Sequence, residues 1–280
     1  MDVLNKVPVR EQEAAARAKN FEEVCLGYNM EEAMCEAERC INCKNAQCMK
    51  GCPVSINIPA FIEQVKLGNM EAAYQIISES SALPAVCGRV CPQESQCEGK
   101  CIRGIKGDAI AIGKLERFVA DWARENGIKP APAKEKLGKK VAVIGSGPAG
   151  LTCAGDLAKL GYDVTYARNY TDVDDKIIAK SHETGIPADE YAAKMIENIN
   201  AIMDKFNVDD PDIWLKATQN IDNIIHFVSQ LIAKGHAYPT KNGDVYFDVE
   251  SFPGYGKLSN RNIEDALDGV RVDNDDEKKN

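Results

Sequence analysis

Cysteine is concentrated in one part of this 280-residue chain, where ten of the eleven cysteines lie between Cys25 and Cys101. Eight of them form two groups of similar spacing, Cys40-x2-Cys43-x4-Cys48-x3-Cys52 and Cys87-x3-Cys91-x5-Cys97-x3-Cys101. In each group a Cys-x3-Cys pair is followed directly by proline. So many thiols in one segment indicate disulfides, zinc sites or iron–sulfur clusters.

These three alternatives differ in the compartment and the spacing that they require. The N-terminus lacks an apolar segment and a small-residue cleavage site, so we expect a cytoplasmic protein, where disulfides are rare. Zinc usually takes Cys-x2-4-Cys pairs, and only Cys40 and Cys43 fit that pattern well. The spacing therefore favours iron–sulfur clusters. No apolar run approaches the roughly 20 residues of a membrane span, and we expect no membrane association.

Charge and composition divide the chain further. Residues 1–165 hold 21 basic and 21 acidic residues, so the net charge of −9 comes entirely from the rest. A stretch rich in lysine and proline at 129–140 predicts a linker. We therefore expect a helical domain at 1–128, the linker, a short α/β unit at 141–166 and a last segment at 167–280. Good helix formers predict helix over most of residues 10–40.

A glycine motif follows the linker. Val141–Ile144 predicts a buried strand, Pro148–Leu160 a helix and Asp163–Tyr166 a second strand. Between strand and helix lies Gly-x-Gly-x-x-Gly, the pattern of a dinucleotide-binding turn. Its candidate cofactor-binding residues are Gly145, Gly147, Pro148, Ala149 and Gly150.

The first half of the chain carries several sequence motifs of a known family. They are Ala37-Glu-Arg-Cys-Ile-Asn-Cys43, Gly51-Cys-Pro-Val54, Ile58-Pro-Ala-Phe-Ile62, Leu83-Pro-Ala-Val-Cys-Gly-Arg-Val-Cys-Pro92, Gln96-Cys-Glu-Gly-Lys-Cys101 and Ile112-Gly-Lys-Leu-Glu-Arg-Phe118. Residues 31–165 thus resemble the glutamate synthase (NADPH) small subunit and the N-terminal part of dihydropyrimidine dehydrogenase. The resemblance implies a helical domain with two [4Fe–4S] clusters and a role in electron transfer.

The same resemblance implies the ligands of both clusters. One cluster would be held by Cys40, Cys43, Cys48 and Cys101. The other would be held by Cys52, Cys91, Cys97 and Glu116, although the alternative for Glu116 is an ordinary exposed helix glutamate. Cys87 is then a spare thiol near a cluster, whereas Cys25, Cys35 and Cys153 are interpreted as small hydrophobic residues.

The resemblance also implies an FAD site at the glycine motif, which relatives reduce with NADPH, and an electron-accepting flavoprotein large subunit or domain as partner. Such a site needs an acidic residue after the second strand to hold the ribose, and Arg168 stands where the family has glutamate. The segments that continue the FAD site and supply the NADPH domain are absent. We therefore expect a truncated FAD site without tight binding, and a chain that is not catalytically complete as an oxidoreductase.

From Tyr166 onward the chain carries a different set of sequence motifs. They include Ala167-Arg-Asn-Tyr-Thr-Asp-Val-Asp-Asp-Lys-Ile-Ile178, Ala217-Thr-Gln-Asn-Ile221, Leu231-Ile-Ala-Lys-Gly-His-Ala-Tyr238, Asn242-Gly-Asp-Val-Tyr-Phe-Asp-Val249, Tyr255-Gly-Lys-Leu-Ser259 and Gly269-Val-Arg-Val-Asp273. Residues 166–280 resemble an internal fragment of cysteinyl-tRNA synthetase. We expect helices near 173–183, 188–206 and 221–234, and a hairpin turning at Asn242-Gly243.

The motifs with which that family binds ATP, selects cysteine and binds tRNA are not found. The chain lacks its His-Ile-Gly-His and Lys-Met-Ser-Lys-Ser signatures, so we expect neither ligase activity nor tRNA as partner. His182, His226 and His236 are interpreted as surface or packing residues, and Thr171 and Asp172 resemble a strand-end position beside the amino-acid pocket.

The two resemblances meet at residues 159–166, where the sequence is similar to both families. This predicts a join at a shared short sequence. The expected fold class is an α-helical iron–sulfur domain, a partial α/β Rossmann unit and a mostly α-helical fragment with a β-hairpin. Iron–sulfur electron transfer is the favoured function, and the alternatives are an inactive cysteine–tRNA ligase fragment and a non-functional chimeric reading frame.

Overall fold

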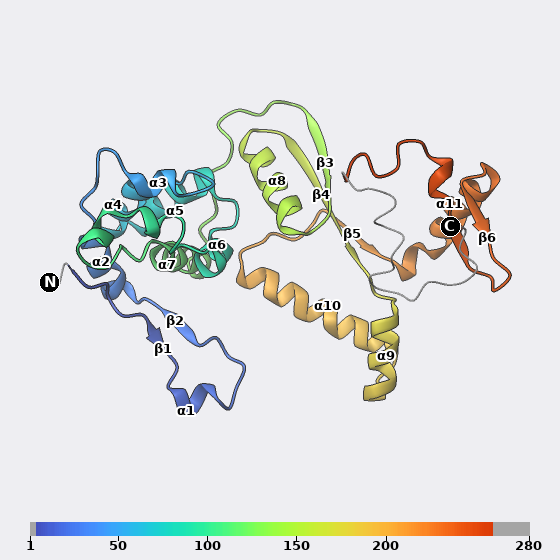
Figure 1. Ribbon diagram of the computed structural model, residues 1–280, viewed down its shortest axis with the longest axis horizontal. Helices are drawn as coiled ribbons and strands as arrows, with labels where there is room; N and C mark the ends of the chain where they lie inside the picture. Colours follow the sequence, from blue (N-terminus) through green and yellow to red (C-terminus); the bar gives the residue numbers. More distant parts are fainter. Residues whose placement is uncertain (1–3, 260–280) are drawn as a thin grey trace. The chain divides into compact units, whose positions relative to one another are not determined.

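The computed structural model describes residues 4–259 and separates into two compact units (Figure 1). The first unit contains the chain up to Tyr170 together with Lys176–Trp214. The second contains Thr171–Asp175 and the chain from Leu215 onward. No helix in the described part of the chain is both long enough and apolar enough to cross a membrane.

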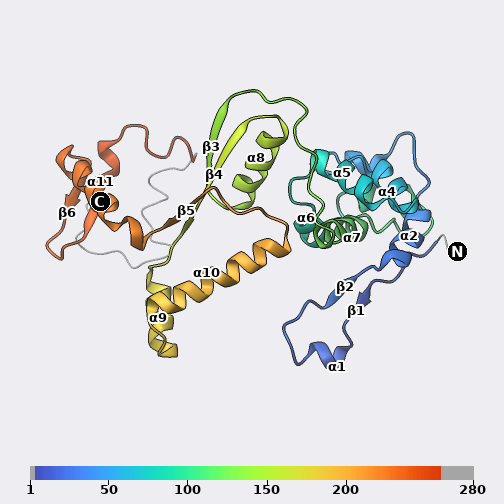
Figure 2. The ribbon, with the colours of Figure 1, turned by 180° about the vertical axis from the view of Figure 1, so that it is seen from behind.

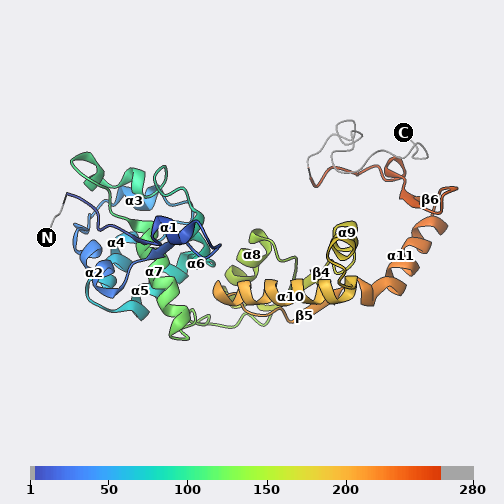
Figure 3. The same ribbon diagram turned by 90° about the horizontal axis from the view of Figure 1, so that it is seen from below.

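The first unit begins with a helical domain (Figure 3). Its helices are α2 (Met30–Glu38), α3 (Gln47–Lys50), α4 (Ile58–Lys66), α5 (Met70–Ser80), α6 (Pro84–Val90) and α7 (Ile112–Glu125), with short 3-10 turns η1 (Glu98–Lys100) and η2 (Ile102–Ile105). Helix α7 contacts α2, α4, α5 and α6, so it forms the centre of the domain. Its buried face includes Leu115 and Val119, which join Phe61, Val65 and Ile77 in one apolar core.

Local sequence signals set the ends of these helices. The Asn29 side chain accepts a hydrogen bond from the Glu32 amide, and the Glu32 carboxylate accepts one from the Asn29 amide, which is a complete capping box for α2. Asn57 caps α4 in a similar way, by accepting from the Ala60 amide. After α4, Gly68 adopts a φ of 77°, which favours glycine and ends the helix.

The region before α2 corrects one expectation from the sequence. Of residues 10–29 only α1 (Ala14–Arg17) is helical, and it lies between the short antiparallel strands β1 (Arg10–Glu11) and β2 (Cys25–Gly27). Figures 1 and 2 both show these strands as an arm with α1 at its tip. The predicted helix over this stretch was wrong because residues 10–20 contain no large apolar side chain that a helix could bury. The prediction held for α2.

A buried ion pair connects three segments of the helical domain. Arg39 Nη1 lies 2.6 Å from Glu36 Oε1, and both side chains are fully buried. Glu36 also accepts hydrogen bonds from the amides of Val7 and Ala111, each at 2.8 Å, and Arg39 Nη2 donates to the Asp108 carbonyl at 2.6 Å. The pair therefore joins the N-terminal segment, α2 and the loop that precedes α7.

The rest of the first unit contains a strand, a helix and a strand in the predicted positions. Strands β3 (Lys140–Ile144) and β4 (Asp163–Tyr170) are parallel, with Lys140 opposite Asp163 and Ile144 opposite Ala167. Helix α8 (Pro148–Lys159) connects them and contacts both strands (Figure 2). Strand β5 (Ile213–Lys216) extends the sheet on the other side of β4, and α10 (Ala188–Lys205) precedes it.

The second unit contains η3 (Thr218–Asn220), α11 (Ile221–Ala233), the hairpin of β6 (Ala237–Pro239) and β7 (Val245–Phe247), and η4 (Val249–Ser251). The hairpin pairs Tyr238 with Tyr246, and Gly243 in its turn has a φ of 91°. This confirms the predicted hairpin. The predicted helices are likewise found as α9 (Asp175–Thr184), α10 and α11. The Gly269–Asp273 motif lies outside the described residues.

The buried ion pair leads to a test of stability. Glu36→Gln leaves the Arg39 charge buried without its counter-charge, so we expect a loss of about 3–5 kcal/mol in the free energy of unfolding. Urea unfolding of the purified chain, followed by circular dichroism, measures this loss. Glu11→Gln is the matched control, since it breaks an exposed ion pair with Arg17 and is expected to cost less than about 1 kcal/mol. Equal losses in the two variants would contradict the central role of Glu36.

Candidate iron–sulfur site

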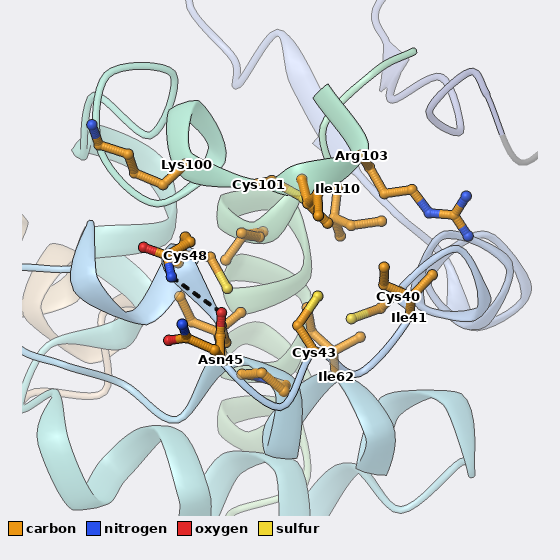
Figure 4. Close-up of a pocket in the computed structure, with 16 residues that line it drawn as sticks. Cys40, Ile41, Cys43, Asn45, Cys48, Ile62, Lys100, Cys101, Arg103 and Ile110 are labelled. Carbon is orange, nitrogen blue, oxygen red and sulfur yellow. Dashed lines mark hydrogen bonds between the residues drawn. The ribbon is translucent and has the colours of Figure 1, made fainter. Parts of the chain in front are cut away.

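Four of the predicted cysteine ligands line one cavity of about 110 Å³ in the helical domain (Figure 4). Cys40 and Cys43 lie in the loop after α2, Cys48 is on α3 and Cys101 lies between η1 and η2. The Gln47 side chain donates a hydrogen bond to the Asn45 carbonyl at 3.3 Å in the loop between Cys43 and Cys48. Two stretches of the chain, residues 40–48 and Cys101, thus supply thiols to one cavity, as the spacing alone could not show.

The cavity is apolar and has basic residues in its wall. Ile58, Ile62, Ile110 and Ile112 contribute apolar surface, while Lys100 and Arg103 add positive charge. Arg103 Nε donates to the Arg39 carbonyl at 2.8 Å, which holds the arginine beside the loop that carries Cys40. Such an environment suits a buried, anionic metal cluster because it combines low polarity with nearby cations.

Burial of these thiols makes the protonated form more stable in the absence of a bound metal. It is the main cause that raises the pKa of Cys48 to about 11, and the neighbouring Cys101 adds to the effect. Burial likewise raises the pKa of Cys40. Iron binding requires thiolates, so a cluster bound at this site would release protons on binding and would supply the positive charge that stabilises the thiolates.

The second group of predicted ligands comes from different elements. Cys52 follows α3, Cys91 ends α6, Cys97 precedes η1 and Glu116 lies on α7. Burial raises the pKa of Cys91 and raises that of Cys97 to about 12, and in both cases Cys52 and Glu116 are close enough to contribute. These four side chains therefore lie near one another.

Glu116 is buried, so its interpretation as an exposed helix glutamate is wrong. Only 7% of the residue is exposed, and its Oε1 atom has no hydrogen-bond partner. Desolvation raises its pKa to about 8. A buried carboxylate oxygen without a partner is costly, and three neighbouring thiols make a metal centre a suitable partner for it.

The donor set fits iron–sulfur clusters. The predicted ligands are seven thiols and one carboxylate, and thiolates are the usual ligands of such clusters. All eleven cysteines are free thiols. Among residues 4–259, no three His, Cys, Asp or Glu side chains are arranged around a single metal ion.

The predicted glycine motif forms a tight turn between β3 and α8. Gly145 has a φ of 124°, and a Cβ atom on Gly150 would lie 2.3 Å from the Gly145 carbonyl oxygen. Gly147 caps α8 and Pro148 occupies its first turn, followed by Ala149. The turn therefore has the close backbone approach for which these glycines were singled out.

Arg168 has a structural role that the sequence did not reveal. It is only 2% exposed, and its guanidinium carbon lies 5.9 Å from the Tyr166 ring centroid and 5.2 Å from that of Trp214. Trp214 also stacks on Tyr170, with 5.0 Å between ring centroids. Arginine at this position thus packs among aromatic rings of β4 and β5, and offers no carboxylate to a ribose.

In the second unit, Asp172 accepts hydrogen bonds from both the amide and the hydroxyl of Thr218, at 3.0 and 2.5 Å. Partial burial opposes its charge, but these hydrogen bonds lower its pKa overall. His226 contacts Gln230 and His236 contacts Ser251, each at 2.9 Å. Thus Asp172 and these two histidines have local structural partners.

Comparison with known protein families divides the chain into two parts. The family described as "Dihydroprymidine dehydrogenase domain II, 4Fe-4S cluster" matches residues 17–128. The family described as "tRNA synthetases class I (C) catalytic domain" matches residues 152–280. Both resemblances inferred from the sequence are therefore confirmed, and residues 17–128 are similar to a 4Fe–4S type of domain.

Individual relatives show the same division. The glutamate synthase [NADPH] small chain of Halomonas elongata is 34% identical over 197 residues, which is 70% of this chain and 41% of the relative. That of Azospirillum brasilense is 39% identical over 153 residues, 54% of this chain and 32% of the relative. The cysteine–tRNA ligase of Maridesulfovibrio salexigens is 51% identical over 118 residues, 42% of this chain and 24% of the relative. The chain thus spans less than half the length of each.

The burial of Glu116 predicts how stability depends on pH when no cluster is bound. Its folded-state pKa of about 8 exceeds the ordinary glutamate pKa of 4.5, so folding binds a proton at pH values between these two. The resulting stabilisation is present at low pH and is lost as pH rises through about 8. We expect a slope of at most about 1.4 kcal/mol per pH unit.

Urea unfolding of the cluster-free, reduced chain from pH 5 to pH 9 measures this slope. Glu116→Gln removes the titrating carboxyl, so the difference between the two stability curves isolates its contribution from that of other groups. Curves that run parallel over this range would show that the Glu116 carboxyl is solvated.

Proposed function

We propose that this chain is an iron–sulfur electron-transfer module that carries two [4Fe–4S] clusters. Cys40, Cys43, Cys48 and Cys101 would hold the first cluster, and Cys52, Cys91, Cys97 and Glu116 would hold the second. The proposal rests mainly on the cavity that gathers four thiols from two distant stretches of the chain. The buried, unpartnered Glu116 carboxylate among three further cysteines supports the second cluster.

The two sites are connected through the chain. Cys48 and Cys52 lie at the two ends of the same turn, and Cys97 and Cys101 likewise border η1. Each of these short segments would contribute one ligand to each cluster, which resembles the exchange of ligands in two-cluster ferredoxins. Two clusters linked in this way provide a short path for electrons across the helical domain.

The partner would be an electron-accepting flavoprotein subunit or domain, as the glutamate synthase small-chain relatives suggest. FAD would bind weakly at best to Gly145–Gly150 because Arg168 is packed in the sheet and the chain offers no acidic residue in its place. The domains would be 1–128, the linker 129–140, the α/β unit 141–166 and the last segment. The isolated chain would then pass electrons without oxidising NADPH.

Iron analysis tests the two-cluster proposal directly. The chain purified without oxygen is expected to hold about eight irons, with a broad absorption band in the visible. Replacement of Cys40, Cys43, Cys48 and Cys101 together by alanine should reduce this to about four, since it removes all ligands of the first cluster only. Cys153→Ser, which alters an exposed thiol remote in sequence from both groups, should leave about eight. Zinc in place of iron would refute the proposal.

The 51% identity to a cysteine–tRNA ligase makes aminoacylation the second candidate function. The matched segment begins at residue 152, and the preceding residues match the iron–sulfur family instead. The chain therefore lacks the ATP-binding His-Ile-Gly-His signature that the ligase resemblance requires.

We accordingly expect no cysteine-dependent exchange of pyrophosphate into ATP by the purified chain. A complete cysteine–tRNA ligase assayed in parallel provides the positive control. Exchange above the level of a reaction without cysteine would establish the ligase as the function of the second half.

A further inference from the structure

Cys87 lies beside the second group of ligands, although the proposed function assigns it no role. It is half-buried on α6, one helical turn before Cys91, and its sulfur accepts a hydrogen bond from Ser81 Oγ at 3.9 Å. Positions 87 and 91 are four residues apart at the end of α6, so their side chains lie on the same side of the helix. A fifth thiol therefore neighbours one of the four proposed ligands.

A close approach of two helices places Cys87 near Glu116 as well. A Cβ atom on Gly88 would lie only 2.6 Å from the backbone nitrogen of Arg117, so α6 and α7 meet backbone to backbone at this point. Their neighbours in sequence, Cys87 and Glu116, are close enough for the carboxylate to disfavour the Cys87 thiolate. Gln93 fixes this arrangement because its amide donates to the Cys87 carbonyl at 3.3 Å.

The two candidate donors differ in how well they suit iron. Glu116 is a hard oxygen donor whose Oε1 has no other partner, whereas a thiolate is the ligand that iron–sulfur clusters usually take. Cys87 already lies at the edge of the group, where its sulfur accepts a hydrogen bond from Ser81. We expect a rotation of its side chain away from Ser81 to turn its sulfur toward the group.

We propose that Cys87 is a reserve ligand of the second cluster, which binds the iron assigned to Glu116 when that carboxylate is lost or released. This inference rests on the proposed two-cluster function. In the exchange an iron–oxygen bond would break and an iron–sulfur bond would form, while the proton of the Cys87 thiol would pass to the released carboxylate or, where Glu116 has been replaced, to water. No electron is transferred, so no oxidant or reductant is needed.

The test compares variants of the full chain by iron content and by electron paramagnetic resonance. Glu116→Leu fills the same space without a donor atom, and we expect it to keep about eight irons because Cys87 takes over. The double variant Glu116→Leu/Cys87→Ala should fall to about seven irons and show the signal of an oxidised three-iron cluster. Cys87→Ala alone should keep about eight, since Glu116 remains.

Two controls separate ligand exchange from loss of structure. The double variant Glu116→Leu/Cys35→Ala removes a half-buried cysteine of α2 instead, and it should behave as Glu116→Leu does. The spectrum of the first cluster reports whether each variant is folded, and Glu116→Ala is a second variant without a donor atom if leucine disturbs the packing.

The outcomes distinguish the two proposals. Equal three-iron signals in Glu116→Leu and in Glu116→Leu/Cys87→Ala, with eight irons in the unaltered chain, would overturn the role of Cys87 alone. An unaltered chain with about four irons or none would overturn the two-cluster function and with it the role of Cys87.

Discussion

The buried pair of Glu36 and Arg39 is the interaction on which the helical domain depends. Its hydrogen bonds reach the N-terminal segment at Val7 and the start of α7 at Ala111. The Arg39 carbonyl also accepts from Arg103, which lines the first thiol cavity. Removal of two charges from water is costly, and it is compensated here because nearly every polar atom of the pair has a partner. The pair thus fixes the loop that follows α2, and this loop carries Cys40 and Cys43.

The second group of thiols depends on a different contact, the one between α6 and α7. Gly88 allows the two backbones to approach, and Gly113 allows the Gln93 side chain to pack against α7 in the same way. A side chain at Gly88 would meet the backbone of Arg117, push α6 away from α7 and separate Cys91 from Glu116, whereas a side chain at Gly113 would displace the Gln93 side chain. The Glu36–Arg39 ion pair therefore positions the first group of ligands, and the Gly88 contact positions the second. The two interactions are independent, although both involve α7 or its start.

Much of this organisation could be predicted from the sequence. The parts that could not be predicted have one physical reason in common. The cysteine spacing, the strand, helix and strand around Gly145–Gly150 and the Asn242-Gly243 hairpin are local signals, and the structure has these elements where they were expected. The burial of Glu116 and the aromatic contacts of Arg168 depend on residues distant in sequence, such as Trp214. Composition predicted helix for residues 10–20, but helical propensity without an apolar face does not determine tertiary structure.

Strand β4 lies between strands from the two halves of the chain. It pairs with β3, which follows the iron–sulfur domain, and it neighbours β5, which lies in the segment similar to the ligase. Pairing between strands uses backbone amides and carbonyls, which are the same whatever side chains a strand carries. A sheet can therefore combine strands whose sequences resemble different families, provided that the alternation of side chains between its two faces continues without a shift. A helical core, whose side chains must interlock, would not combine such segments so readily.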